Sequence, residues 1–141
     1  MSPNVIPTGK YLIKNAGFKN LAYLPDSNYD SSLTANASIE IDGAQKWNIT
    51  QLSNGHYNIQ NYQNVSFASC GTRAEKGHRV VGRDNAKQWV LTETKIKNQY
   101  VISPSDSEVF WGLDNGEEHT PITLTQTPTD PRNQWTFEST P

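Results

Sequence analysis

Residues 45–59, QKWNITQLSNGHYNI, contain the two features that decide the fold. Trp47-Asn-Ile49 and Tyr57-Asn-Ile59 each alternate large apolar and polar side chains, the period of a half-buried β-strand. Ser53-Asn-Gly55 lies between them and has the composition of a tight turn. The stretch therefore predicts a β-hairpin, and the rest of the chain repeats its two triplets.

The repeat runs from one end of the chain to the other. The tyrosine triplets advance by 46 and 43 residues, and the tryptophan triplets advance by 42 and 46. Their first residues are Tyr11, Tyr57 and Tyr100, and Trp47, Trp89 and Trp135. Internal periodicity of this kind indicates one structural unit used three times. We predict repeats over residues 8–50, 51–93 and 94–139.

Further apolar positions follow the same spacing. Thirteen residues beyond each repeat tyrosine lie Leu24, Cys70 and Leu113. Twenty-two beyond lie Leu33, Arg79 and Ile122, where Arg79 is discordant and is followed by Val80 and Val81. Cys70 is thus expected to be a small buried hydrophobe and not a nucleophile.

Four short strands per unit give twelve in all, and no window shows the 3.6-residue apolar stripe of a long helix. A closed barrel explains three such units better than an open array, because closure removes exposed strand edges. The prediction is an all-β, β-trefoil fold: one domain, residues 1–141, with three pseudo-symmetric four-stranded repeats.

Composition excludes several classes of function. The 141 residues carry 12 Lys and Arg against 14 Asp and Glu, so there is no concentrated positive charge for nucleic acid. A single cysteine rules out an intrachain disulfide. We found neither an eighteen-residue apolar run nor a leader-peptide pattern, which predicts no membrane span and a cytoplasmic location. We expect a monomer.

Catalytic motifs are missing from the sequence. We found no Gly-x-Ser-x-Gly, Cys-x-x-Cys, His-Glu-x-x-His or phosphate-binding glycine loop. His56, His78 and His119 fall in different repeats, so a metal cluster is not expected. The sequence predicts a non-enzymatic binding protein without cofactor or metal.

Two family resemblances complete this prediction. Gln45-Lys-Trp47, Gln88-Trp89 and Gln134-Trp135 resemble the Gln-x-Trp or Gln-Trp motif of ricin B-like (R-type) β-trefoil lectins. Residues 7–15 and 47–59 resemble more closely the mushroom cospin-type (mycospin) serine protease inhibitors, a related family. The closer resemblance favours a protease inhibitor in fungal defence, with a sugar-binding lectin as the alternative.

The inhibitor resemblance implies a trypsin-like serine protease as partner and a loop that enters it in a substrate-like manner. That loop comprises Pro25, Asp26, Ser27, Asn28, Tyr29 and Asp30, with Asn28 as the inserted residue. Residue types alone favour an ordinary polar hairpin loop here. Because Asn28 suits a trypsin pocket poorly, the basic loop with Arg73 and Lys76 is a second candidate.

The lectin resemblance implies a glycan site in the third repeat. Its candidate residues are Trp111, Asp114, Asn115, Asn133 and Gln134. A carboxylate can accept bonds from sugar hydroxyls, and a tryptophan face can pack on sugar C–H groups. Pro25 and Gly71 replace Asp114 in the other repeats, so one site of three is expected. Trp111 replaces Ala22 and Ala68, and it is either a core filler or an exposed platform.

Overall fold

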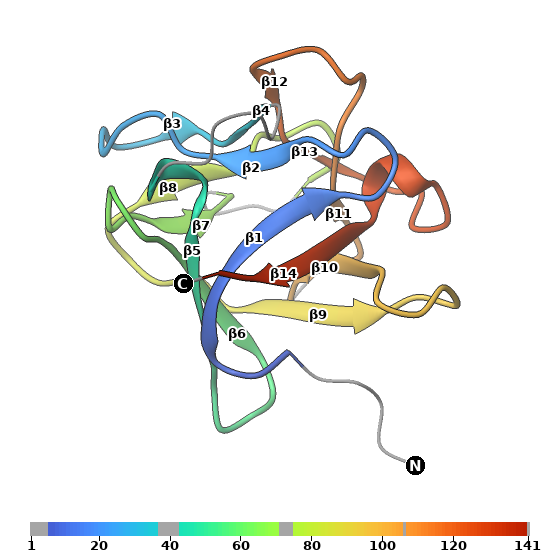
Figure 1. The fold of residues 1–141 in the computed structure, drawn as a ribbon, viewed down its shortest axis with the longest axis horizontal. Helices are drawn as coiled ribbons and strands as arrows, with labels where there is room; N and C mark the ends of the chain where they lie inside the picture. Colours follow the sequence, from blue (N-terminus) through green and yellow to red (C-terminus); the bar gives the residue numbers. More distant parts are fainter. Residues whose placement is uncertain (1–5, 37–42, 71–74, 106, 141) are drawn as a thin grey trace.

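The computed structural model describes residues 6–36, 43–70, 75–105 and 107–140, which form strands and two short 3-10 turns (Figure 1). The first repeat contains β1 (Gly9–Asn15), β2 (Leu21–Tyr23), β3 (Ser31–Ser32), β4 (Thr34–Asn36), η1 (Gly43–Gln45) and β5 (Trp47–Gln51). The second contains β6 (Tyr57–Asn61), β7 (Phe67–Ser69), β8 (Val81–Arg83) and β9 (Trp89–Glu93). The third contains β10 (Tyr100–Pro104), β11 (Phe110–Gly112), β12 (Thr120–Pro121), β13 (Thr123–Thr125), η2 (Pro131–Asn133) and β14 (Trp135–Ser139).

Six long strands close into a barrel. Antiparallel pairing runs from β1 to β14, β10, β9, β6 and β5, and β5 pairs with β1 again. The hairpins β5–β6 and β9–β10 turn through positive-φ residues, Gly55 (φ 86°) and Asn98 (φ 71°). The predicted hairpin at residues 45–59 is confirmed, with Trp47 opposite Asn61 and Ile49 opposite Ile59.

Short strand pairs close one end of this barrel. Each repeat supplies one: β2 with β4, β7 with β8, and β11 with β13. The four predicted strands of each repeat are therefore present. Two additional two-residue strands link the repeats, β3 to β8 and β12 to β4.

Three backbone hydrogen bonds form a ring that joins the repeats. The Leu33 N–H donates to the Val80 carbonyl (2.8 Å), Val80 to Ile122 (2.9 Å) and Ile122 back to Leu33 (2.9 Å). All three side chains are fully buried. Val80, and not Arg79, therefore takes the second-repeat position, because this repeat has one extra residue before it. The Arg79 side chain is exposed and its Nη1 lies 3.3 Å from Ser32 Oγ.

The tryptophan ladder has the same threefold pattern. The indole Nε1 groups of Trp47, Trp89 and Trp135 donate to the carbonyls of Ala22 (3.0 Å), Ala68 (2.9 Å) and Trp111 (2.9 Å). The three indoles are fully buried, as predicted for a core ladder. These bonds confirm that Trp111 stands where the other repeats have alanine.

The fold is a β-trefoil, as predicted. Leu24, Cys70 and Leu113 are buried together in the core, so Cys70 does pack as a small hydrophobe. In the described part of the chain, no helix has the length and hydropathy to cross a membrane.

Candidate functional site

One polar corner of the third repeat is built around η2. Asp130 caps this turn: its carboxylate accepts from the Arg132 backbone N–H (3.0 Å), and Pro131 fixes φ at the first turn position. The same carboxylate forms an ion pair with the Arg132 guanidinium, with Nη2 and Oδ2 3.0 Å apart. These contacts hold the pKa of Asp130 below its usual value.

The backbone beneath Arg132 is fixed from two sides. Its carbonyl accepts from the Leu113 N–H (3.1 Å) and from Asn15 Nδ2 (2.9 Å). Arg132 Nη1 also donates to the Asp114 carbonyl at 3.4 Å. The guanidinium therefore has a set position although half of the side chain is exposed.

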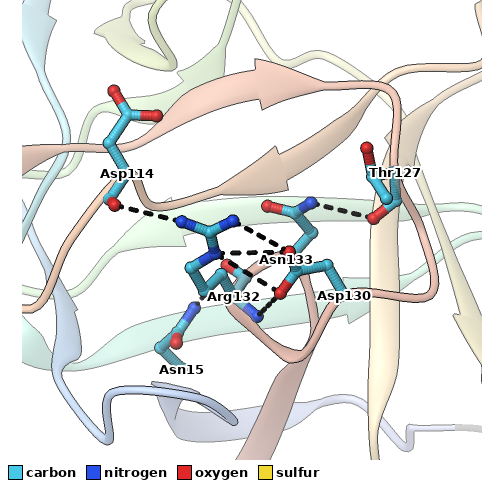
Figure 2. Close-up of polar contacts among 6 residues, drawn as sticks. All are labelled: Asn15, Asp114, Thr127, Asp130, Arg132 and Asn133. Atoms are coloured by element: carbon cyan, nitrogen blue, oxygen red, sulfur yellow. Dashed lines mark hydrogen bonds and ion pairs between the residues drawn. The ribbon is translucent and has the colours of Figure 1, made fainter.

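Asp114 lies beside this guanidinium. Its carboxylate points away from the guanidinium, as Figure 2 shows, and makes no hydrogen bond or ion pair with another described residue. Ala44 and residue Ala86 occupy the positions equivalent to Arg132, three residues before each ladder tryptophan. An exposed carboxylate beside an anchored guanidinium thus occurs at this position in the third repeat alone. The corner therefore has an acceptor group and a donor group, with the Asp114 carboxylate directed away from the Arg132 guanidinium (Figure 2).

Trp111 is a core filler and not a platform. It is 0% exposed, and its ring makes edge-to-face contacts with Trp89 and Trp135 at centroid distances of 5.3 and 6.2 Å. Its Nε1 has no partner among the described residues. The predicted stacking role is therefore corrected: a fully buried indole cannot pack on a sugar.

The remaining predicted sugar contacts divide between two faces. Asn115 Oδ1 accepts from the Glu117 N–H (2.9 Å) and Thr120 Oγ1 (2.7 Å), so it holds its own loop. Asn133 is 6% exposed, and its Nδ2 donates to the Thr127 carbonyl (2.8 Å; Figure 2). Gln134 is 4% exposed and borders a different cleft, which the β9–β10 hairpin also lines.

Sequence analysis missed Arg132 and Asp130. The signal was present in Asp130-Pro131, the usual order of an N-cap followed by proline at the first position of a helical turn. What the sequence could not supply was the position of Asp114, eighteen residues earlier, next to the guanidinium.

The predicted inhibitory loop is well anchored. Asp26 Oδ1 accepts from the Asn28 N–H (2.9 Å), and the Asn28 carbonyl accepts from the Ser31 N–H (3.1 Å). Asp30, at φ 65°, pairs with Arg83, with Oδ1 and Nε 2.6 Å apart. Asn28 therefore stands at the start of a tight turn. Its carbonyl is engaged within the loop and is not presented on an extended strand.

Other members of this loop and of the alternative loop lie at the surface. Tyr29 is 65% exposed and lies over the Arg83 guanidinium, 5.0 Å from ring centroid to Cζ. Pro25 and Ser27 are also at the surface. Lys76 is exposed, whereas Arg73 lies outside the described residues. No group of His, Cys, Asp and Glu in the described segments could hold a metal ion.

Comparisons with known proteins support the fold. The chain matches no protein-family model and no curated protein in sequence. Its structure is similar to the Rhizoctonia solani agglutinin (18% identity, TM-score 0.89, covering 99% of this chain and 100% of that one). It is also similar to a Macrolepiota procera ricin B-like lectin in complex with lactose (15% identity, TM-score 0.86, covering 98% of this chain and 100% of that one). A third similar structure is the designed threefold-symmetric protein ThreeFoil (12% identity, TM-score 0.86, covering 94% of this chain and 99% of that one). At these identities the likeness establishes the β-trefoil fold.

Proposed function

We propose that the protein is a non-enzymatic, carbohydrate-binding lectin whose site is the Asp114–Arg132 corner of the third repeat. The observation that carries the proposal is the break in threefold symmetry at this point. Where two repeats have alanine, the third has a guanidinium that is anchored by Asp130 and donates to the Asp114 carbonyl, and the Asp114 carboxylate is exposed on its outer side. The carboxylate can accept from one sugar hydroxyl, and the guanidinium can donate to another.

The comparisons favour this function over protease inhibition. A structural neighbour over nearly the whole chain is a ricin B-like lectin seen with lactose, and another is an agglutinin. Fold alone does not fix function, so the proposal depends on the corner itself. Because Trp111 is buried, recognition here rests on polar contacts. We therefore expect weak monosaccharide binding.

Glycan-array binding tests the proposal. Asp114→Ala and Arg132→Ala should each lower binding at least tenfold, since each removes one side of the polar pair. Asp84→Ala is the matched control, because Asp84 is an exposed aspartate in the second repeat and should leave binding unchanged. A parent protein that binds no glycan rejects the function. Binding that survives both corner variants rejects the site.

Protease inhibition is the second candidate, and the observation that favours it is the set of polar contacts within the Pro25–Asp30 loop. A pre-ordered loop loses little entropy on binding, and the Asp30–Arg83 pair and the Asp26–Asn28 bond order this one. The turn at Asn28 counts against substrate-like insertion. Trypsin and chymotrypsin assays with Asn28→Ala and Lys76→Ala decide the matter. If the parent and both variants inhibit equally, Asn28 and Lys76 are not the inhibitory residues. If the parent inhibits neither protease, the inhibitor function is rejected.

A further inference from the structure

Two Asn-Gly pairs occur in the chain, at Asn54-Gly55 and Asn115-Gly116. Each lies in an exposed turn, and each asparagine closes the same local ring: its side-chain Oδ1 accepts from the backbone N–H two residues further on, at 2.9 Å. This ring folds the side chain forward over the peptide of the glycine, which has no Cβ to shield its nitrogen. The two pairs therefore share their local chemistry, and their surroundings distinguish them.

The reaction open to such a pair is loss of the side-chain amide. The glycine backbone nitrogen attacks the asparagine Cγ and gives up its proton, the Cγ–Nδ2 bond breaks, and Nδ2 leaves as ammonia with that proton. A succinimide ring remains. Water then adds to one of the two ring carbonyl carbons, and the bond from that carbon to the ring nitrogen breaks, which gives aspartate or isoaspartate. The reaction needs a glycine N–H that can be deprotonated, an amide nitrogen that can leave and a polarised carbonyl.

At Asn54 both nitrogens are engaged. The Gly55 N–H donates to the Leu52 carbonyl at 3.0 Å. Asn54 Nδ2 donates to Gln88 Oε1, also at 3.0 Å. Each bond must break before its nitrogen can attack or leave, and one net hydrogen bond corresponds to about a fivefold change in rate. The surroundings of Asn54 therefore protect it.

At Asn115 neither nitrogen is held within the described part of the chain. The Gly116 N–H and Asn115 Nδ2 make no hydrogen bond to another described residue. The side-chain carbonyl has two donors: besides the Glu117 N–H, Oγ1 of the buried Thr120 lies 2.7 Å from Oδ1, and it also reaches the Glu117 carbonyl at 2.8 Å. A backbone N–H can only donate, so it fixes which end of the amide is oxygen. Such donors stabilise the negative charge that develops on the oxygen during attack.

We propose that Asn115 is a site of spontaneous deamidation, and that the fold activates it relative to Asn54. Packing keeps the reactive pair in the chain, since a Cβ at residue 116 would lie 2.9 Å from Phe18 Cδ1 and glycine is therefore favoured there. Both products place a carboxylate directly after Asp114 and add one negative charge to the formal net charge of −2. Isoaspartate also inserts one carbon atom into the backbone. The modification does not depend on the lectin proposal.

Peptide mapping by mass spectrometry after incubation in mildly alkaline buffer tests the inference. It measures both asparagines in one sample, so Asn54 is the internal control. In the folded protein Asn115 should convert at least about fivefold faster than Asn54. In guanidinium chloride the two rates should become similar, because the unfolded chain keeps both Asn-Gly sequences and loses the hydrogen bonds. A rate at Asn115 equal to or below that at Asn54 in the folded protein overturns the inference, and so does a rate ratio that persists in the unfolded chain.

Two variants, checked for folding by circular dichroism, test the contacts. Gln88→Ala, at an exposed position, frees Asn54 Nδ2 and should raise the Asn54 rate about fivefold while leaving Asn115 unchanged. Thr120→Val keeps the shape of the side chain and removes one donor from Asn115 Oδ1, so it should lower the Asn115 rate. A loosened loop would raise that rate instead. An unchanged Asn54 rate in Gln88→Ala, or a raised Asn115 rate in Thr120→Val, contradicts the assigned contacts and overturns the inference.

Discussion

Replacing Trp111 with alanine separates a core residue from a binding platform. Its indole is 0% exposed and packs edge-to-face against Trp89 and Trp135. A buried tryptophan removes about 200 Å² from water, worth about 5 kcal/mol at about 25 cal/mol per Å². The unpartnered Nε1 offsets about 1–3 kcal/mol of this, because its burial is itself costly.

The net loss expected for Trp111→Ala is therefore about 2–4 kcal/mol, and the unfilled cavity adds to it. The melting temperature should fall by about 10 °C. Trp111→Phe keeps an aromatic ring and removes the unpartnered N–H, so it should cost less than about 2 kcal/mol. The backbone should tolerate alanine at position 111, since Ala22 and Ala68 hold the equivalent positions and their carbonyls accept the same kind of hydrogen bond from an indole N–H.

Urea unfolding followed by circular dichroism measures these losses, and the glycan array run on the same samples supplies the contrast. A core role predicts a lower urea midpoint and glycan binding that persists while the variant is folded. The reasoning is refuted if Trp111→Ala keeps the parent's midpoint and loses glycan binding, because that result belongs to an exposed stacking residue.

Two further predictions concern packing and pH. Gly112→Ala should lower the free energy of unfolding by about 1–3 kcal/mol, because a Cβ at this position collides with the buried Asn133 amide. Gly9→Ala is the control: a Cβ there has its nearest contact at 3.4 Å, so the urea midpoint should change little. Equal midpoints for the two variants would contradict this packing. Burial raises the pKa of Tyr57, which favours the neutral phenol in the folded state, so stability should hold below pH 10 and fall as the pH rises through the folded pKa. Absorbance titration should show tyrosinate forming at higher pH in the folded chain than in the chain unfolded in urea. Coincident titration curves would disprove the raised pKa.

The tyrosine and tryptophan ladders could be predicted because the threefold symmetry of a β-trefoil appears in the sequence as a regular spacing of residues. Tyr11, Tyr57 and Tyr100 face the interior at corresponding barrel positions, so their spacing survives in the chain. Counting at a fixed offset failed at Arg79, because one extra residue in the second repeat moved Val80 into the bonded ring. Spacing alone cannot detect such an insertion.

The sites were less accessible to sequence reasoning because they depend on contacts between distant segments. Trp111 could be assigned to the core or to the surface with equal reason, since alanine precedents say nothing about where a larger side chain points. The proximity of Asp114 to Arg132 arises from the folding of β11 against η2. Gln88 and Gln134 hold equivalent sequence positions, yet the Gln134 amide donates to the Pro128 carbonyl, whereas the Gln88 amide meets Asn54 and His56, from a hairpin more than thirty residues earlier in the chain.

The ring of Leu33, Val80 and Ile122 has a consequence for how the chain folds. Each of its hydrogen bonds joins two different repeats, so a fragment of one repeat makes none of them and a fragment of two makes only one. Closing the ring requires contacts between residues 42 to 89 positions apart, and such non-local contacts slow folding. A single-repeat or two-repeat fragment should therefore remain unfolded, and the intact chain should fold slowly and in one cooperative step.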